Sequence, residues 1–182
     1  GGLNRINLDA DGYTVDPVII SPERKSALED SLMMFFTGFT RFSADVQATL
    51  RSSMRDKTAE LREMLALVDV AENVLVDKSV PLDDFGRLLD ETWKLKRGIS
   101  SSVSTDSIDG IYASARKAGA LGGKLLGAGG GGFLVFYVPA DRRDEVMRAM
   151  EGLMYVPFRF ENGGTRVIHY TPETYVMRNR ET

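Results

Sequence analysis

The sequence contains no cysteine and only one histidine, His169, and these absences exclude several kinds of site. Without cysteine there is no disulfide framework, no thiolate zinc site and no cysteine nucleophile. One histidine cannot form a multi-histidine metal site. The chain also lacks an excess of positive charge, because its formal net charge is −3. It therefore offers no basic face for nucleic acid.

Long hydrophobic runs are also absent. No apolar stretch approaches the roughly 20 residues that span a bilayer, and no signal peptide is visible. Hydrophobic residues still make up 43% of the 182 residues, which is enough for one substantial core. These features predict a soluble, cytoplasmic protein that binds neither nucleic acid nor membrane. The sequence begins at Gly1, without methionine and within a strand-like run, which predicts a fragment or a processed product.

The first part of the chain predicts a hairpin, a short helix and a strand. Two strand-like runs flank the turn signal at residues 9–12, which indicates a hairpin. Ser21 before Pro22 is typical of a helix cap followed by the first helical residue. The apolar run at residues 31–36 predicts a strand that ends at Thr37 and Gly38.

Helical spacing follows, and then a pattern of strands. The spacing predicts a helix of about thirty residues from Ser43, a second helix near Pro81 and a third capped within residues 104–106. The apolar positions of the first of these helices are Val46, Leu50, Met54, Leu61, Leu65, Val68 and Val74. Beyond Gly119 the pattern predicts two strands, a helix around residues 141–150, and strands at residues 155–160 and 165–170. This order predicts an α+β fold with an antiparallel sheet.

The stretch GAGGGG at residues 127–132 matches none of three familiar phosphate-binding templates. It satisfies the dinucleotide fingerprint G-x-G-x-x-G, but that fingerprint requires a helix afterwards, and here the strand-like FLVFYV follows. A Walker A motif is excluded because Leu125 follows Lys124, where Ser or Thr is required. The protein-kinase motifs V-A-I-K, H-R-D and D-F-G do not occur in the chain.

Two physical explanations of these glycines remain. A tight hairpin packed against a helix needs only one or two of them. Consecutive unobstructed N–H groups can instead bind an anion, or allow a very close backbone approach. We favour the anion interpretation, with Lys124 adding positive charge unless strand alternation directs it to solvent. The candidate phosphate- and substrate-binding residues are Gly127, Ala128, Gly129, Gly130, Gly131, Lys124 and Arg41.

Other candidates have both a structural and a functional interpretation. The guanidinium fork of Arg41 suits a sugar phosphate, and the alternative is a surface or capping arginine. Lys94, Lys96 and Arg97 fall near a predicted helix C-terminus, where cations favour the helix dipole. The alternative for one of these three is a contact with a substrate phosphate.

Four further residues are expected to be structural. Trp93 is expected in the core rather than in a lid over the substrate. Asp106 and Asp109 are expected as a helix cap and a first-turn carboxylate rather than a catalytic base. His169 is expected to be a structural histidine near the end of a strand.

Three segments together resemble a known family. GALGGKLLGAGGGGFLVFYV resembles the third motif of the GHMP small-molecule kinases. The segments FFTGFTRFS and WKLKRGISSSVSTDSIDGIYASARKAGALGGK resemble one branch, the D-glycero-D-manno-heptose 7-phosphate kinases. The resemblance implies a ferredoxin-like, two-layer C-terminal domain at residues 21–182. Residues 1–20 would then be the last strands of an N-terminal domain.

The resemblance also implies an activity. A kinase of this branch transfers the γ-phosphoryl group of ATP, with Mg²⁺, to the anomeric hydroxyl of a heptose 7-phosphate. Its nucleotide loop of the P-x-x-x-G-L-G-S-S type and its catalytic aspartate would lie in an N-terminal half that this sequence lacks. The chain is therefore expected to carry no catalytic residue and no metal ligand, and to be inactive without that half.

Two alternatives stay open beside the heptose kinase. One is a related sugar kinase, such as a fucokinase-like enzyme. The other is a stand-alone ferredoxin-like module that binds a small anionic ligand without turnover. The oligomeric state is also open, with a homodimer among the alternatives.

Overall fold

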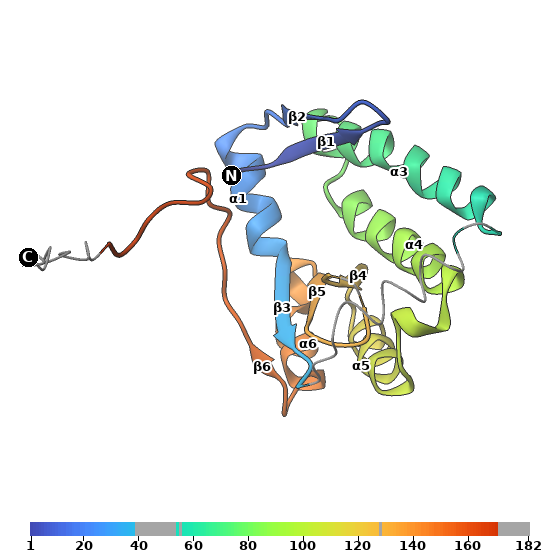
Figure 1. Cartoon of the computed structure of the whole chain (residues 1–182). Coiled ribbons are helices and arrows are strands. Elements are labelled where there is room, and N and C mark those ends of the chain that lie inside the picture. Colours follow the sequence, from blue (N-terminus) through green and yellow to red (C-terminus); the bar gives the residue numbers. More distant parts are fainter. Residues whose placement is uncertain (39–53, 55, 128, 171–182) are drawn as a thin grey trace, which may run out of the picture. The chain divides into compact units, whose positions relative to one another are not determined.

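The computed structural model describes residues 1–38, 54, 56–127 and 129–170 (Figure 1). Arg41 and Ala128 lie outside the described residues. The contacts divide the chain into two compact units. One unit is Val18–Arg159, and the other combines Gly1–Pro17 with the segment from Phe160 onward.

The predicted N-terminal hairpin is confirmed. Strands β1 (Asn4–Leu8) and β2 (Tyr13–Pro17) pair antiparallel. The side chain of Asp9 closes the turn by accepting hydrogen bonds from the backbone N–H groups of residues 11 and 12, at 2.8 and 2.9 Å. The register and the alternation of the strands place four large apolar residues on one face. These are Ile6, Leu8, Tyr13 and Val15, and all four are exposed.

The unit Val18–Arg159 is built on a four-stranded antiparallel sheet in the order β4-β5-β3-β6. The strands are β3 (Leu32–Phe36), β4 (Gly122–Leu125), β5 (Phe133–Tyr137) and β6 (Met154–Tyr155). Helices connect β3 to β4 and β5 to β6, whereas β4 and β5 form a hairpin. This is the β-α-β-β-α-β topology of ferredoxin-like folds, so the expected α+β architecture is confirmed.

Two helices, α1 and α5, begin at a residue whose side chain caps them. Ser21 caps α1 (Pro22–Ser31) by accepting a hydrogen bond from the backbone N–H of Arg24 at 3.3 Å. Thr105 caps α5 (Asp106–Lys117) through the N–H of Ile108, also at 3.3 Å. The described residues also form the helices α3 (Thr58–Val76), α4 (Asp83–Ile99) and α6 (Arg143–Ala149), with 3-10 turns η1 (Ser101–Val103) and η2 (Ala140–Arg142).

Two predictions of secondary structure are wrong in part. A turn at Asp56 precedes α3, so the expected thirty-residue helix from Ser43 is not continuous, and residues 43–53 lie outside the described part. Leu65 is 67% exposed, because α3 packs mainly on α4 and carries more apolar residues than one neighbour can cover. The expected strands at 155–160 and 165–170 are reduced to β6, because in the described segment no other strand pairs beyond Tyr155.

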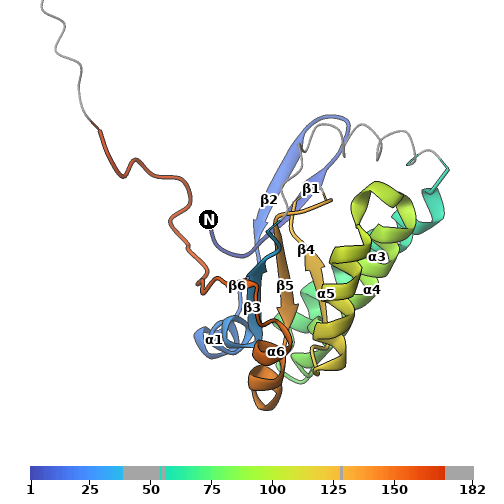
Figure 2. The same cartoon turned by 90° about the horizontal axis from the view of Figure 1, so that it is seen from below.

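The core lies between the sheet and its helices, and α4 lies beside the edge strand β4 (Figure 2). Trp93 of α4 is 1% exposed, which confirms its expected place in the core. Gly86 and Gly122 let α4 and β4 approach closely, since a Cβ atom on Gly122 would stand 1.9 Å from the carbonyl oxygen of Gly86. This contact fixes the position of α4 along β4.

Candidate functional site

The predicted glycine run forms the connection between β4 and β5, and we call Gly127–Gly132 the glycine loop. The strand β3 holds one end of it: the backbone N–H and the hydroxyl of Thr37 both donate to the carbonyl oxygen of Gly132, at 2.9 Å each. The turn η1 holds the middle, where the N–H of Gly130 donates to the carbonyl oxygen of Val103 at 3.0 Å. The loop is therefore fixed by elements far away in the sequence.

Gly129 explains part of the requirement for glycine. Its φ is +122°, and a Cβ atom there would stand 2.8 Å from the carbonyl oxygen of Val103. Both the backbone conformation and the close approach to η1 exclude a side chain. The backbone N–H of Gly130 donates its hydrogen bond to the carbonyl oxygen of Val103 and is therefore not available to a ligand. Among the predicted anion-binding amides, those of Gly127, Gly129 and Gly131 remain candidates.

Helix α4 contributes a lysine to the same loop. The Nζ atom of Lys96 donates to the carbonyl oxygen of Gly127 at 2.9 Å. The side chain is half-buried, and this burial, together with the nearby charge of Lys124, lowers the pKa of Lys96. Lys124 lies on β4, two residues after Gly122. Because side chains alternate along a strand, Lys124 lies on the same face as Gly122, and this face packs against α4.

The two neighbours of Lys96 have structural roles. The Nζ atom of Lys94 pairs with a carboxylate oxygen of Asp90 at 2.6 Å. Arg97 pairs with Asp109 at 2.5 Å, joining α4 to the first turn of α5. Of the three cations considered from the sequence, only Lys96 contacts the glycine loop through a hydrogen bond in the part of the chain that the structure describes.

Asp90 connects α4 to α5. It is 7% exposed and accepts a hydrogen bond from the hydroxyl of Tyr112 at 2.7 Å. Burial acts to raise the pKa of Asp90, but the hydrogen bonds from Lys94 and Tyr112 and the charge of Arg116 outweigh it, so the pKa lies below its usual value. Burial, with the hydrogen bond to Asp90, raises the pKa of Tyr112.

The remaining sequence candidates do not gather at the loop. Asp106 is the first helical residue of α5 rather than its cap, and Asp109 is a first-turn carboxylate bonded to the hydroxyl of Ser104 at 2.6 Å. His169 is exposed in a segment without strand structure, so its expected place in a strand is wrong. Thr37 was missed as a loop anchor, because its role depends on the pairing of β3 with β5.

A polar cavity of about 510 Å³ lies between the C-terminus of α4 and the N-terminus of α5. The turn η1 contributes to it and contacts the glycine loop through Val103. Its lining is rich in hydroxyl groups and comprises Lys94, Arg97, Gly98, Ser100, Ser101, Ser104, Thr105, Asp106 and Asp109.

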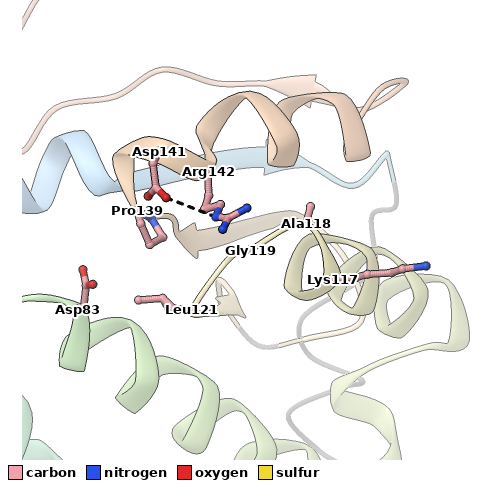
Figure 3. Close-up of a pocket in the computed structure, with 8 residues that line it drawn as sticks. All are labelled: Asp83, Lys117, Ala118, Gly119, Leu121, Pro139, Asp141 and Arg142. Carbon is pink, nitrogen blue, oxygen red and sulfur yellow. Dashed lines mark ion pairs between the residues drawn. The ribbon is translucent and has the colours of Figure 1, made fainter.

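A second cavity of about 530 Å³ lies at the other end of the β4–β5 hairpin (Figure 3). Leu121, which precedes β4, and Pro139, which follows β5, both line it. Asp141 and Arg142 form an ion pair at 3.4 Å beside it. Because it is separated from the glycine loop by the length of the hairpin, we do not include this cavity in the candidate site.

The described residues contain neither a membrane-spanning helix nor a metal-binding cluster. No helix there combines the length and the apolar character needed to cross a membrane. Within the same residues, no three His, Asp or Glu side chains converge in a way that could hold a metal ion.

Comparison with known proteins gives matches that include the candidate site. Residues 81–156 match the family model of the GHMP kinases C terminal. The chain is 31% identical over 158 residues to D-glycero-alpha-D-manno-heptose 7-phosphate kinase of Campylobacter jejuni, covering 82% of this chain and 44% of that protein. It is 28% identical over 142 residues to the bifunctional fucokinase/GDP-fucose pyrophosphorylase of Arabidopsis thaliana, covering 75% of this chain and 13% of that protein.

A solved structure has the same fold. The mevalonate kinase of L. major superposes with a TM-score of 0.66 at 20% identity, covering 85% of this chain and 48% of that one. The chain thus spans less than half the length of each of these relatives. Since the family model covers α4, α5 and the glycine loop, and the ferredoxin-like topology agrees, the chain carries a C-terminal domain of the GHMP kinase family.

Proposed function

We propose that the chain is the C-terminal half of an ATP-dependent sugar kinase that phosphorylates the anomeric hydroxyl of a heptose 7-phosphate. The observation that carries this proposal is the glycine loop, held on three sides by Thr37, Val103 and Lys96. A loop fixed in advance keeps its unobstructed amides in place for an anion. The similarity to a heptose 7-phosphate kinase supports the choice of sugar.

The proposed reaction needs positioning and charge more than covalent help. The anomeric oxygen forms a bond to the γ-phosphorus of ATP while the bond from that phosphorus to the bridging oxygen breaks, and the hydroxyl proton leaves to a base. In this scheme the amides of Gly127, Gly129 and Gly131 and the charge of Lys124 face the phosphates. Arg41 is proposed for the phosphate that the sugar already carries. The base would lie in the N-terminal half.

ATP fits the residues present, because glycine amides that no side chain obstructs, beside a lysine, are suited to phosphate. Mg²⁺ has no cluster of three acidic ligands among the residues that the structure describes. Such an ion usually keeps waters and binds through nucleotide phosphates and one or two carboxylates. We therefore propose that Mg²⁺ reaches the site with ATP.

The N-terminal hairpin supports the proposal of a missing half. A two-stranded hairpin is at best marginally stable alone, yet here Leu8 and Tyr13 of its apolar face are 78% and 71% exposed. We propose that residues 1–20 complete a sheet of the N-terminal domain, and that residues 21–182 form the C-terminal domain. The chain alone is then inactive.

The test is ADP release from ATP with Mg²⁺ and D-glycero-D-manno-heptose 7-phosphate. This chain is compared with the protein expressed from its whole reading frame, and L-fucose and mevalonate serve as alternative acceptors. We expect release only from the longer protein and only with the heptose phosphate. Release with L-fucose would identify the fucokinase-like alternative. Ligand binding without turnover in both proteins would favour the stand-alone module.

A further inference from the structure

Helix α4 and strand β4 run alongside each other toward the glycine loop. They meet at Gly86 and Gly122, and further along both elements Lys96 meets Gly127. From Gly86 to Lys96 the helix advances about 15 Å at 1.5 Å per residue. The strand β4 is extended from Gly122 to Leu125, about 10 Å at 3.3 Å per residue, and the chain then continues into the glycine loop. The two contacts follow the same order along both elements, so α4 and β4 run in the same direction and reach the loop together.

Lys124 points toward the helix that carries Lys96. Strand alternation places Lys124 on the same face as Gly122, and that face meets the backbone of Gly86 and Asp90 in α4. The two ammonium groups therefore approach each other beside the glycine loop. The lowered pKa of Lys96, to which the charge of Lys124 contributes after burial, agrees with this arrangement.

No carboxylate compensates these two charges within the described ranges. Lys94 and Arg97, on the same helix as Lys96, each have an acidic partner. In the described part of the chain neither Lys96 nor Lys124 forms an ion pair, and both are half-buried. Two positive charges close together in a partly buried environment repel each other, and a bound anion would offset this repulsion.

We propose that Lys96 and Lys124 together bind one phosphate group beside the glycine loop, and that Lys96 holds the loop in place at the same time. An ammonium group has three protons to donate. One of them goes to the carbonyl oxygen of Gly127, which leaves two for phosphate oxygens. The identity of the ligand rests on the proposed function, because ATP and a sugar phosphate both present this group.

The test measures binding by calorimetry to the protein expressed from its whole reading frame, with inorganic pyrophosphate, ATP and D-glycero-D-manno-heptose 7-phosphate as probes. Lys96→Gln and Lys124→Gln are each expected to lower the affinity for the same probe by roughly 10- to 100-fold. This is the range for the loss of a hydrogen bond to a charged group. The effects of the two substitutions should not add, because they remove parts of one site. Lys96→Arg keeps the charge and should retain most of the affinity.

Lys117→Gln is the matched control. It removes the same charge from the exposed C-terminus of α5, beside the cavity at the other end of the hairpin, and should leave binding unchanged. Thermal unfolding of each variant shows that it is folded. Loss of affinity for ATP and pyrophosphate assigns the site to the nucleotide, and loss for the sugar phosphate alone assigns it to the acceptor.

The outcomes separate this inference from the proposed function. An active wild-type kinase whose Lys96→Gln and Lys124→Gln variants bind all three probes normally would overturn the lysine site and leave the kinase standing. A wild-type protein that binds pyrophosphate but has no kinase activity, and whose Lys96→Gln and Lys124→Gln variants bind pyrophosphate roughly 10- to 100-fold more weakly, would leave the lysine site standing and overturn the kinase.

Discussion

Gly129 shows that a glycine run can serve packing and binding at once. Its positive φ and its distance to the carbonyl oxygen of Val103 require glycine for reasons unrelated to any ligand. The backbone N–H of the neighbouring Gly130 donates a hydrogen bond to the same carbonyl oxygen. The middle of the glycine loop is therefore a structural contact with η1, which places the remaining amides for an anion.

We expect Gly129→Ala to lower the free energy of unfolding by about 1–3 kcal/mol, because the new Cβ must move η1 and the backbone is strained. Urea unfolding measures this, and ADP release by the longer protein should fall with it. The control is Gly110→Ala in α5, where nothing lies within 4 Å of the added Cβ and φ is not positive. This control should stabilise the helix by about 0.5–1 kcal/mol. Equal stability of the two variants would contradict the close approach of Gly129 to the carbonyl oxygen of Val103.

At the scale of elements, the Gly86–Gly122 contact sets the position of α4, and with it the position of Lys96. A Cβ atom on Gly122 would collide with the backbone of α4. We expect Gly122→Ala to destabilise the protein by about 1–3 kcal/mol. It should also weaken pyrophosphate binding, although Gly122 lies several residues before the glycine loop. A variant that is destabilised but binds pyrophosphate normally would show that Lys96 does not depend on this contact.

The connection between α4 and α5 through Asp90 should depend on pH. The pKa of Asp90 in the folded protein lies below its value of about 3.9 in an unfolded chain, so ionised Asp90 favours folding. Its stabilisation is complete above about pH 4 and is lost as the pH falls through the folded-state pKa. Asp90→Asn should cost about 1–3 kcal/mol at pH 7. Much of this comes from Tyr112, because Lys94 is exposed and its share is screened.

Urea unfolding between about pH 7 and pH 2 checks this, since the difference between wild type and Asp90→Asn should shrink toward the acid end. Asp141→Asn provides the control. It removes a carboxylate whose partner Arg142 is exposed, so its effect should stay within about 0.5 kcal/mol. A constant difference for Asp90→Asn across the range would contradict the lowered pKa.

Elements that depend on local signals could be predicted from the sequence. Ser21 with Pro22, the caps within residues 104–106 and the turn at residues 9–12 each carry their own signal. The strands expected at 155–160 and 165–170 had the right composition, but a strand also needs a neighbour to pair with, and the sequence does not show one. The exposure of Leu65 was missed for a similar reason, because periodicity identifies an apolar face and not what covers it.

At the scale of the whole molecule, the sequence indicated the glycine loop but not its supports. Thr37 and Val103 reach the loop only after β3 has paired with β5 and η1 has packed beside it. Lys96 could not be separated from Lys94 and Arg97, since all three lie within one turn of the same helix. The distinction arises from their partners, which are Asp90 on the same helix for Lys94, Asp109 on α5 for Arg97, and Gly127 in the glycine loop for Lys96.

The N-terminal hairpin allows a prediction about contacts with the proposed N-terminal half. If the apolar face of β1 and β2 is covered by the proposed N-terminal half, its backbone amides should exchange slowly in the longer protein. In this chain alone they should exchange quickly, because an uncovered two-stranded hairpin is marginally stable. Hydrogen exchange read by mass spectrometry compares the two proteins.

The strands β3 and β5 serve as the internal reference for this comparison, since their pairing and burial belong to the unit Val18–Arg159. They should be protected to a similar degree in both proteins. Ile6→Ser adds a second check: it should lower the melting temperature of the longer protein, because Ile6 would be buried there, and leave that of this chain unchanged, because Ile6 is 60% exposed. Equal protection of β1 and β2 in both proteins would mean that the N-terminal half does not cover the hairpin.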